Sequence, residues 1–219
     1  MAHVVQRTIA AWWRELIPLA LLNAAWLVTL APAVLLVLVD ALVLALVVVA
    51  FTVAPATAAF YVVAGDVAEG DSAGWRAFWQ AARRHFWPAV RWGLLQAVVY
   101  FVGAFNLTYY AANTGLLWDT LRVAWVLVLA AWTVLQMLYW PLLLEAENQG
   151  IVNTLRNALV MLALNPAFVL AVALLTVVIV VVSVVTGVLV GLVMMPLVTL
   201  LGTFAVRDRL QVFRSRASK

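Results

Sequence analysis

The 219-residue chain contains 68% hydrophobic and only 10% charged residues, and its net charge at pH 7 is +4. A soluble domain carries about 25% charged residues because its surface must face water, so this composition excludes an ordinary soluble fold. The chain has no cysteine, which excludes disulfides and thiolate metal sites. The basic residues lie in short segments beside apolar runs, where they act as topology signals and contact anionic lipids. The expected partner is therefore a lipid bilayer and not a nucleic acid.

Charged residues divide the chain into apolar runs of about 20 residues or more, the length that a helix needs to cross a bilayer. Between Glu15 and Asp40 lie 24 uncharged residues, and 25 more lie between Asp40 and Asp66. Such long, continuous runs do not show the alternating pattern of β-barrel strands. We therefore predict an all-α membrane protein. Its expected spans are residues 17–39, 42–64, 87–109, 123–144, 167–186 and 189–206.

The last two spans come from one uncharged stretch of fifty residues, 157–206. A single helix of that length would measure about 75 Å, far more than one crossing. Two spans that turn near residues 183–191 fit better, and Gly187 and Gly191 favour a turn there.

The distribution of arginine and lysine decides between five and six spans. Six spans with the N-terminus inside place twelve of the thirteen basic residues on the inner side and leave only Arg122 outside. Five spans would put the basic C-terminal tail outside. The positive-inside rule therefore predicts one domain, residues 1–219, that forms a six-transmembrane-helix bundle with both termini in the cytoplasm.

A polar segment between the second and third spans predicts an amphipathic helix over residues 72–86. Trp75, Phe78 and Trp79 fall on one face of it, and Arg83 and Arg84 fall on other faces. This pattern suits a helix that lies on the inner membrane surface with its basic groups toward the lipid headgroups. A helix that docks on a partner protein has the same pattern, so both interpretations stay open.

A second inner segment, from Glu145, also predicts a short cytoplasmic helix before the fifth span, and it carries Glu147 and Arg156. Together the two segments supply the candidate membrane-surface or partner-docking residues, which are Trp75, Phe78, Trp79, Arg83, Arg84, Glu145, Glu147 and Arg156. Prolines recur at related places in the two halves of the chain, at Pro55, Pro88, Pro141, Pro166 and Pro196. Such a repeat can mark a transporter binding site, whereas prolines also simply kink membrane helices.

The residues that carry most enzyme chemistry are missing. His3 and His85 have no second histidine or cysteine at ligand spacing, so no metal site is expected. No phosphate-binding loop, nucleophile elbow or zinc-protease motif occurs. We therefore predict neither enzymatic activity nor a cofactor. Polar residues within the spans, such as Gln96 and Gln136, are few and form no visible stripe, although Gln136 can bond across helices.

The order of these pieces resembles the YesL-like family of bacterial integral membrane proteins. The segments that carry the likeness are LLNAAWLV (21–28), VAPATAAFYVV (53–63), GWRAFWQAARRHFWPAV (74–90), YWPLLLEAENQG (139–150) and TLRNALVMLALNPAF (154–168). The resemblance implies a protein of the bacterial cytoplasmic membrane, often linked with carbohydrate uptake systems. It implies no established activity and no catalytic residues.

Two hypotheses about function follow. The first is a non-enzymatic accessory or assembly subunit of a bacterial inner-membrane complex, such as a carbohydrate ABC transporter, with other membrane subunits as partners. The second is a small-solute transporter or permease-like protein built on the proline-marked repeat. The second requires a polar cavity between spans two, four and six, and a tightly packed, dry apolar bundle would exclude it. The sequence does not indicate an oligomeric state.

Overall fold

The structure is a computed structural model that describes residues 1–145, 150–187 and 193–217. Every regular element in these ranges is an α-helix, so the prediction of an all-α protein is confirmed. In chain order the helices are α1 (Ala2–Arg14), α2 (Leu16–Leu38), α3 (Leu42–Glu69), α4 (Trp75–Arg84), α5 (Phe86–Ala111), α6 (Leu116–Glu145), α7 (Ile151–Leu164), α8 (Pro166–Thr186) and α10 (Met194–Ala217).

Five helices in the described part of the chain are long and apolar enough to cross a membrane, namely α2, α3, α5, α6 and α8. They overlap the first five expected spans, so the predicted count of six is not matched. The sixth expected span, 189–206, begins in residues 188–192, which lie outside the described ranges. Its remainder forms the first half of α10, and this helix continues through the charged residues Arg207, Asp208 and Arg209.

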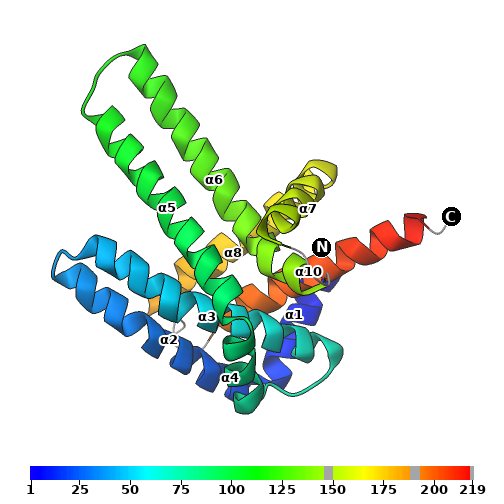
Figure 1. Ribbon diagram of the computed structural model, residues 1–219. Coiled ribbons are helices and arrows are strands. Elements are labelled where there is room, and N and C mark those ends of the chain that lie inside the picture. The colour runs from blue at the N-terminus through cyan, green and yellow to red at the C-terminus, as the bar shows by residue number, and fades with distance from the viewer. Residues whose placement is uncertain (146–149, 188–192, 218–219) are drawn as a thin grey trace.

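Two long helical hairpins, α2–α3 and α5–α6, meet where α3 packs against α5, and Figure 1 shows them diverging toward their tips. The tip of the first hairpin is a turn at Asp40, between the expected spans 17–39 and 42–64. The φ of Asp40, 59°, lies in the left-handed region that aspartate tolerates better than most residues. The second hairpin turns at Gly115, whose φ is 122°.

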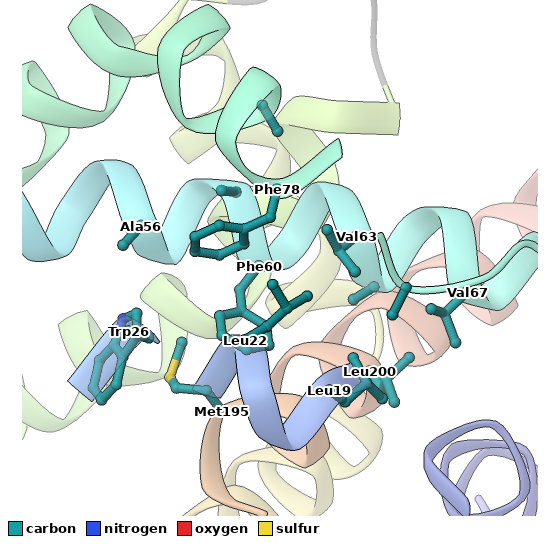
Figure 2. Packing of buried hydrophobic residues seen from close by; sticks show 14 of the residues in the cluster. Leu19, Leu22, Trp26, Ala56, Phe60, Val63, Val67, Phe78, Met195 and Leu200 are labelled. Atoms are coloured by element: carbon teal, nitrogen blue, oxygen red, sulfur yellow. The ribbon is translucent and has the colours of Figure 1, made fainter. Parts of the chain in front are cut away.

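Helix α3 is the centre of the molecule and contacts α2, α4, α5, α6 and α10. Figure 2 shows its Phe60 between Leu22 of α2 and Phe78 of α4. The rings of Phe60 and Phe78 meet edge to face, with their centroids 5.6 Å apart, and both side chains are fully buried. Burying each of these side chains contributes about 2–3 kcal/mol, so apolar packing helps to hold α4 on the bundle.

Two glycines allow close approach between helices. A Cβ at Gly93 of α5 would lie 2.9 Å from the Cα of Ala50 in α3, and a Cβ at Gly103 would lie 2.7 Å from Leu129 in α6. Small residues let membrane helices pack backbone to backbone. Lipid is as apolar as the helices, so dispersion contacts and not the hydrophobic effect favour this packing.

Helix α1 precedes the first expected span, 17–39, and the sequence does not predict it. It packs on α10, and Val4 is buried in a cluster with Val172 of α8 and Leu201 of α10. Short N-terminal helices carry too little apolar length to be recognised as spans, and only the tertiary contact shows where this one lies.

Candidate functional site

A cavity of about 400 Å³ lies between α3, α5, α6, α8 and α10. It therefore lies between the helices of spans two, four and six, where the transporter hypothesis requires a cavity. Most of its wall is apolar, and none of the described residues that line it is charged. The polar side chains in the wall are Thr57, Tyr61, Gln96, Tyr100, Thr133, Gln136 and Thr176.

A chain of hydrogen bonds joins α5 to α6 along this wall. Nε2 of Gln136 donates to the hydroxyl of Tyr100 at 2.6 Å, and that hydroxyl lies 3.0 Å from Oγ1 of Thr133. Thr133 donates its own proton to the carbonyl of Leu129 at 2.8 Å, so Tyr100 must be the donor to Thr133. The expectation that Gln136 bonds across helices is therefore confirmed.

Gln96 has one hydrogen-bonding group without a partner. Its Oε1 accepts from Nε1 of Trp132 at 2.7 Å, and because an indole nitrogen only donates, this contact fixes which way the amide faces. The Nε2 of Gln96 is then buried with no hydrogen-bond partner among the described residues. A buried, unsatisfied donor costs about 1–3 kcal/mol, which is a reason to ask what would satisfy it.

Two polar residues of the wall, Gln96 and Gln136, lie at a similar depth. Gln96 lies ten residues after the start of α5 and Gln136 nine residues before the end of α6, which at 1.5 Å per residue is about 15 Å from each helix end. The hydrocarbon core of a bilayer is about 30 Å thick, so these side chains lie near its middle. The sequence did not indicate this cluster, because its members are scattered over 120 positions from Thr57 to Thr176.

Where α3 and α6 end, Arg207 of α10 holds a cluster of acidic groups. Its guanidinium bonds the carboxylate of Glu145 at the end of α6, lies 2.7 Å from Glu69 at the end of α3, and donates to the carbonyl of Gly65 at 3.3 Å. Bidentate and forked contacts of this kind suit arginine better than lysine. A second cavity of about 280 Å³ opens beside this cluster.

Tyr61 separates the two cavities and lines both. Its ring packs where α3, α6 and α10 cross, beside Pro141 and Gly202, and a Cβ at Gly202 would lie 3.5 Å from the ring and 3.3 Å from the carbonyl of Met137. Among the described residues of α3, Tyr61 is therefore the only one that lines both the cavity of about 400 Å³ and the cavity beside the Arg207 cluster.

The predicted site residues on α4 differ in whether they are buried or exposed. Phe78 is fully buried against Phe60, whereas Trp75 and Trp79 remain exposed, with their rings edge to face at 5.7 Å. Arg83 and Arg84 are exposed as well. The exposed pair of tryptophans and the arginines keep the arrangement expected at a membrane surface or a docking site, and that role stays a prediction.

The predicted residues of the second inner segment meet those of α4 at one place, since Glu145 and Arg84 both line the cavity of about 280 Å³. Glu145 joins the Arg207 cluster, and Arg156 is exposed on α7. Glu147 lies outside the described residues. Arg207 itself was counted only as a topology signal, because a lone arginine after an apolar run gives no sign of which carboxylates it will meet.

Histidines lie at the same end of the molecule. Burial, with a contribution from the charge of Arg84, lowers the pKa of His85, which favours a neutral ring at pH 7. His3 of α1 donates from Nε2 to Oδ1 of Asp208 at 2.6 Å. Burial raises the pKa of Asp208, but its hydrogen bonds with His3 and Arg209 outweigh burial and hold that pKa below 3.8. No group of three or more His, Cys, Asp or Glu residues that could hold a metal ion occurs in the described ranges.

Asp208→Asn is expected to reduce the loss of folding stability that occurs as the pH is lowered. Because the folded-state pKa of Asp208 is lowered, its contribution is fully present above the unfolded value of 3.8 and is lost as the pH falls through the lower folded value. Thermal unfolding of the detergent-solubilised protein between pH 6 and pH 2 measures this. Asp119→Asn, in an exposed outer pair, is the control, and equal pH slopes for the wild type and Asp208→Asn would contradict the assignment.

The fold and the site define an α-helical membrane protein, since five described helices have the length and apolar character to cross a bilayer. Residues 19–107 match a family described as "Protein of unknown function, DUF624". The match covers the first three segments that carried the resemblance and stops before the last two. No curated protein and no solved structure matches the chain.

Proposed function

We propose that the protein is a permease-like, non-enzymatic membrane protein that binds a small solute at mid-membrane depth and moves it across the bacterial cytoplasmic membrane. The observation that carries the proposal is the cavity between α3, α6 and α10, whose lining is uncharged and includes Gln96 and Gln136 at a similar depth. Each of these three helices also contains a proline, at Pro55, Pro141 and Pro196. Helices α3 and α6 continue through their prolines, and such proline-marked helices around a midplane site are found in transporters.

The proposal includes six spans with both termini inside, the first half of α10 being the sixth. Arg207 of α10 contacts the ends of α3 and α6, so the proposed inner boundary of all three helices lies at the same end of the bundle. The contact between His3 and Asp208 supports an N-terminus at that end too. An even number of crossings is required by this arrangement, and the positive-inside rule favours the cytoplasm for that side. The YesL-like resemblance supports the same location.

The absence of natural cysteine makes the cavity testable with single substitutions. Ala97 lines the cavity, and Val98, the next residue of α5, has 58% of its surface exposed on the outside of the bundle. We expect Ala97→Cys to react with a polar, membrane-impermeant thiol reagent at least tenfold faster than Val98→Cys, because water reaches the first and lipid covers the second. Reaction from both sides of sealed vesicles supports transport. Equal, slow reaction of the two variants would contradict the proposal.

The second candidate is an accessory or assembly subunit of a transport complex. The observation that favours it is the α5–α6 hairpin, which diverges from the rest of the bundle (Figure 1). Only 6% of the most apolar part of α5 and 11% of that of α6 are buried. Such a hairpin offers two long faces to helices of another subunit or to lipid. Purification from native membranes in mild detergent tests this candidate, and recovery of the chain alone would count against it.

A further inference from the structure

We infer that the cavity binds an uncharged, largely apolar molecule that presents a hydrogen-bond-accepting oxygen to Nε2 of Gln96. The inference rests on the proposed function and names the class of its solute. It starts from the one buried side-chain nitrogen of the wall that has no hydrogen-bond partner among the described residues.

The ligand is uncharged because the cavity has nothing to balance a charge. No described lining residue is ionisable at neutral pH, and the nearest ion cluster, around Arg207, lies beyond Tyr61 in the other cavity. An ion at the middle of a bilayer costs several kcal/mol unless it is paired or hydrated. A carboxylate or ammonium ligand is therefore disfavoured.

The ligand is largely apolar because most of the wall is. Val53, Trp92, Met195 and Val198 present hydrocarbon, aromatic rings and sulfur to the space. The ring of Trp92 is held in place by stacking on Tyr139, with the centroids 3.5 Å apart and the planes within 3°. A volume of about 400 Å³ lies in the range of small-molecule sites, roughly 300–1,000 Å³.

The ligand carries an acceptor because the wall offers a donor. The hydroxyls of Tyr100 and Thr133 already donate their protons, to Thr133 and to the carbonyl of Leu129 respectively. Thr176 donates to the carbonyl of Val172 in its own helix at 3.0 Å. Gln96 is different, because Trp132 fixes its oxygen and leaves its amide protons available. A carbonyl oxygen would satisfy this donor, whereas a hydrocarbon would leave it unsatisfied.

Three probes of the same shape separate these requirements: 2-naphthamide, 2-naphthoate and 2-methylnaphthalene. Binding is measured by equilibrium dialysis of the full chain in lipid nanodiscs, with empty nanodiscs subtracted to remove partition into lipid. The wild type is expected to bind the amide at least tenfold more tightly than the carboxylate. Gln96→Met is expected to weaken the amide about five- to tenfold and to leave the hydrocarbon unchanged, because one hydrogen bond is lost.

Two further variants keep this test decisive. Asn106→Met, on the same helix, removes an amide that donates to the carbonyl of Val102 outside the cavity lining, and it should bind all three probes as the wild type does. Gln96→Met combined with Trp132→Phe removes both partners of the fixing bond, so no indole proton is stranded. If the amide remains weakened in this double variant, the missing donor is responsible and not a disturbed wall.

Comparing nanodiscs of ester-linked lipid with those of ether-linked lipid identifies the source of the oxygen. Tighter amide binding in ether-linked discs shows that a lipid ester carbonyl occupies the site, and equal binding shows that a free molecule does. Either result supports the inferred chemistry. Tightest binding of naphthoate, or equal weakening of all probes by Gln96→Met, would overturn it. Probe binding without thiol access to Ala97→Cys would instead reject transport and leave the binding site.

Discussion

Gly93→Ala is expected to lower the free energy of unfolding by about 1–3 kcal/mol, even though alanine is the better helix former. The new Cβ would lie 2.9 Å from the Cα of Ala50 and 2.9 Å from the Cβ of Ala54. The Cα is backbone and cannot rotate away, so α5 and α3 must separate. The contact between these helices joins the two hairpins and forms one wall of the cavity. The loss therefore extends beyond one methyl group.

Gly65→Ala is the matched control for this prediction. Gly65 lies inside α3, as Gly93 lies inside α5. A Cβ at Gly65 would meet no atom closer than Nη2 of Arg207, at 3.6 Å, which is an ordinary van der Waals contact. Both substitutions gain about 1 kcal/mol of helix propensity, and only one meets a backbone atom. Unfolding in SDS-containing mixed micelles, followed by tryptophan fluorescence, measures both. If the two variants shift equally, the close packing of α3 and α5 does not limit stability.

The helices could be predicted from the sequence because a bilayer imposes a strict length and polarity on each span. Charges at Glu15, Asp40 and Asp66 mark the ends of two apolar runs, and the structure turns at Asp40 as expected. The sixth span was harder, because its apolar half is continuous with a charged helix. A hydropathy pattern locates where apolar residues stop, but a helix can continue past that point, as α10 does.

The site could not be predicted in the same way, because it depends on contacts between distant segments. Gln96 and Gln136 each look like an isolated polar residue in an apolar run, and only the packing of α5 against α6 places them on one wall. Phe78 illustrates the converse. Its helical spacing with Trp75 and Trp79 indicated a surface that faces lipid or a partner protein, but amphipathic periodicity does not say what covers the apolar face. Here Phe60 of the same chain covers Phe78, whereas Trp75 and Trp79 remain exposed.

Arg207→Gln is expected to lower the free energy of unfolding by about 2–3 kcal/mol. The arginine side chain is 24% exposed and that of Glu145 is 22% exposed, so removing the cation strands a carboxylate that water only partly reaches. Breaking a fully buried pair costs about 3–5 kcal/mol, and partial exposure reduces that cost. A double-mutant cycle with Glu145→Gln measures the coupling directly, because the second substitution removes the stranded charge and should recover part of the loss.

Arg122→Gln is the control for this cycle, since Arg122 pairs with Asp119 in an exposed setting and such pairs contribute about 1 kcal/mol or less. The Arg207 cluster also joins α3, α6 and α10 beside the inner cavity, so its loss has a second consequence. With these ends released, thiol reagents added from the inner side should reach Ala97→Cys faster, because Tyr61 is no longer held between the three helices. An unchanged labelling rate with reduced stability would mean that the cluster stabilises the bundle without controlling access to the cavity.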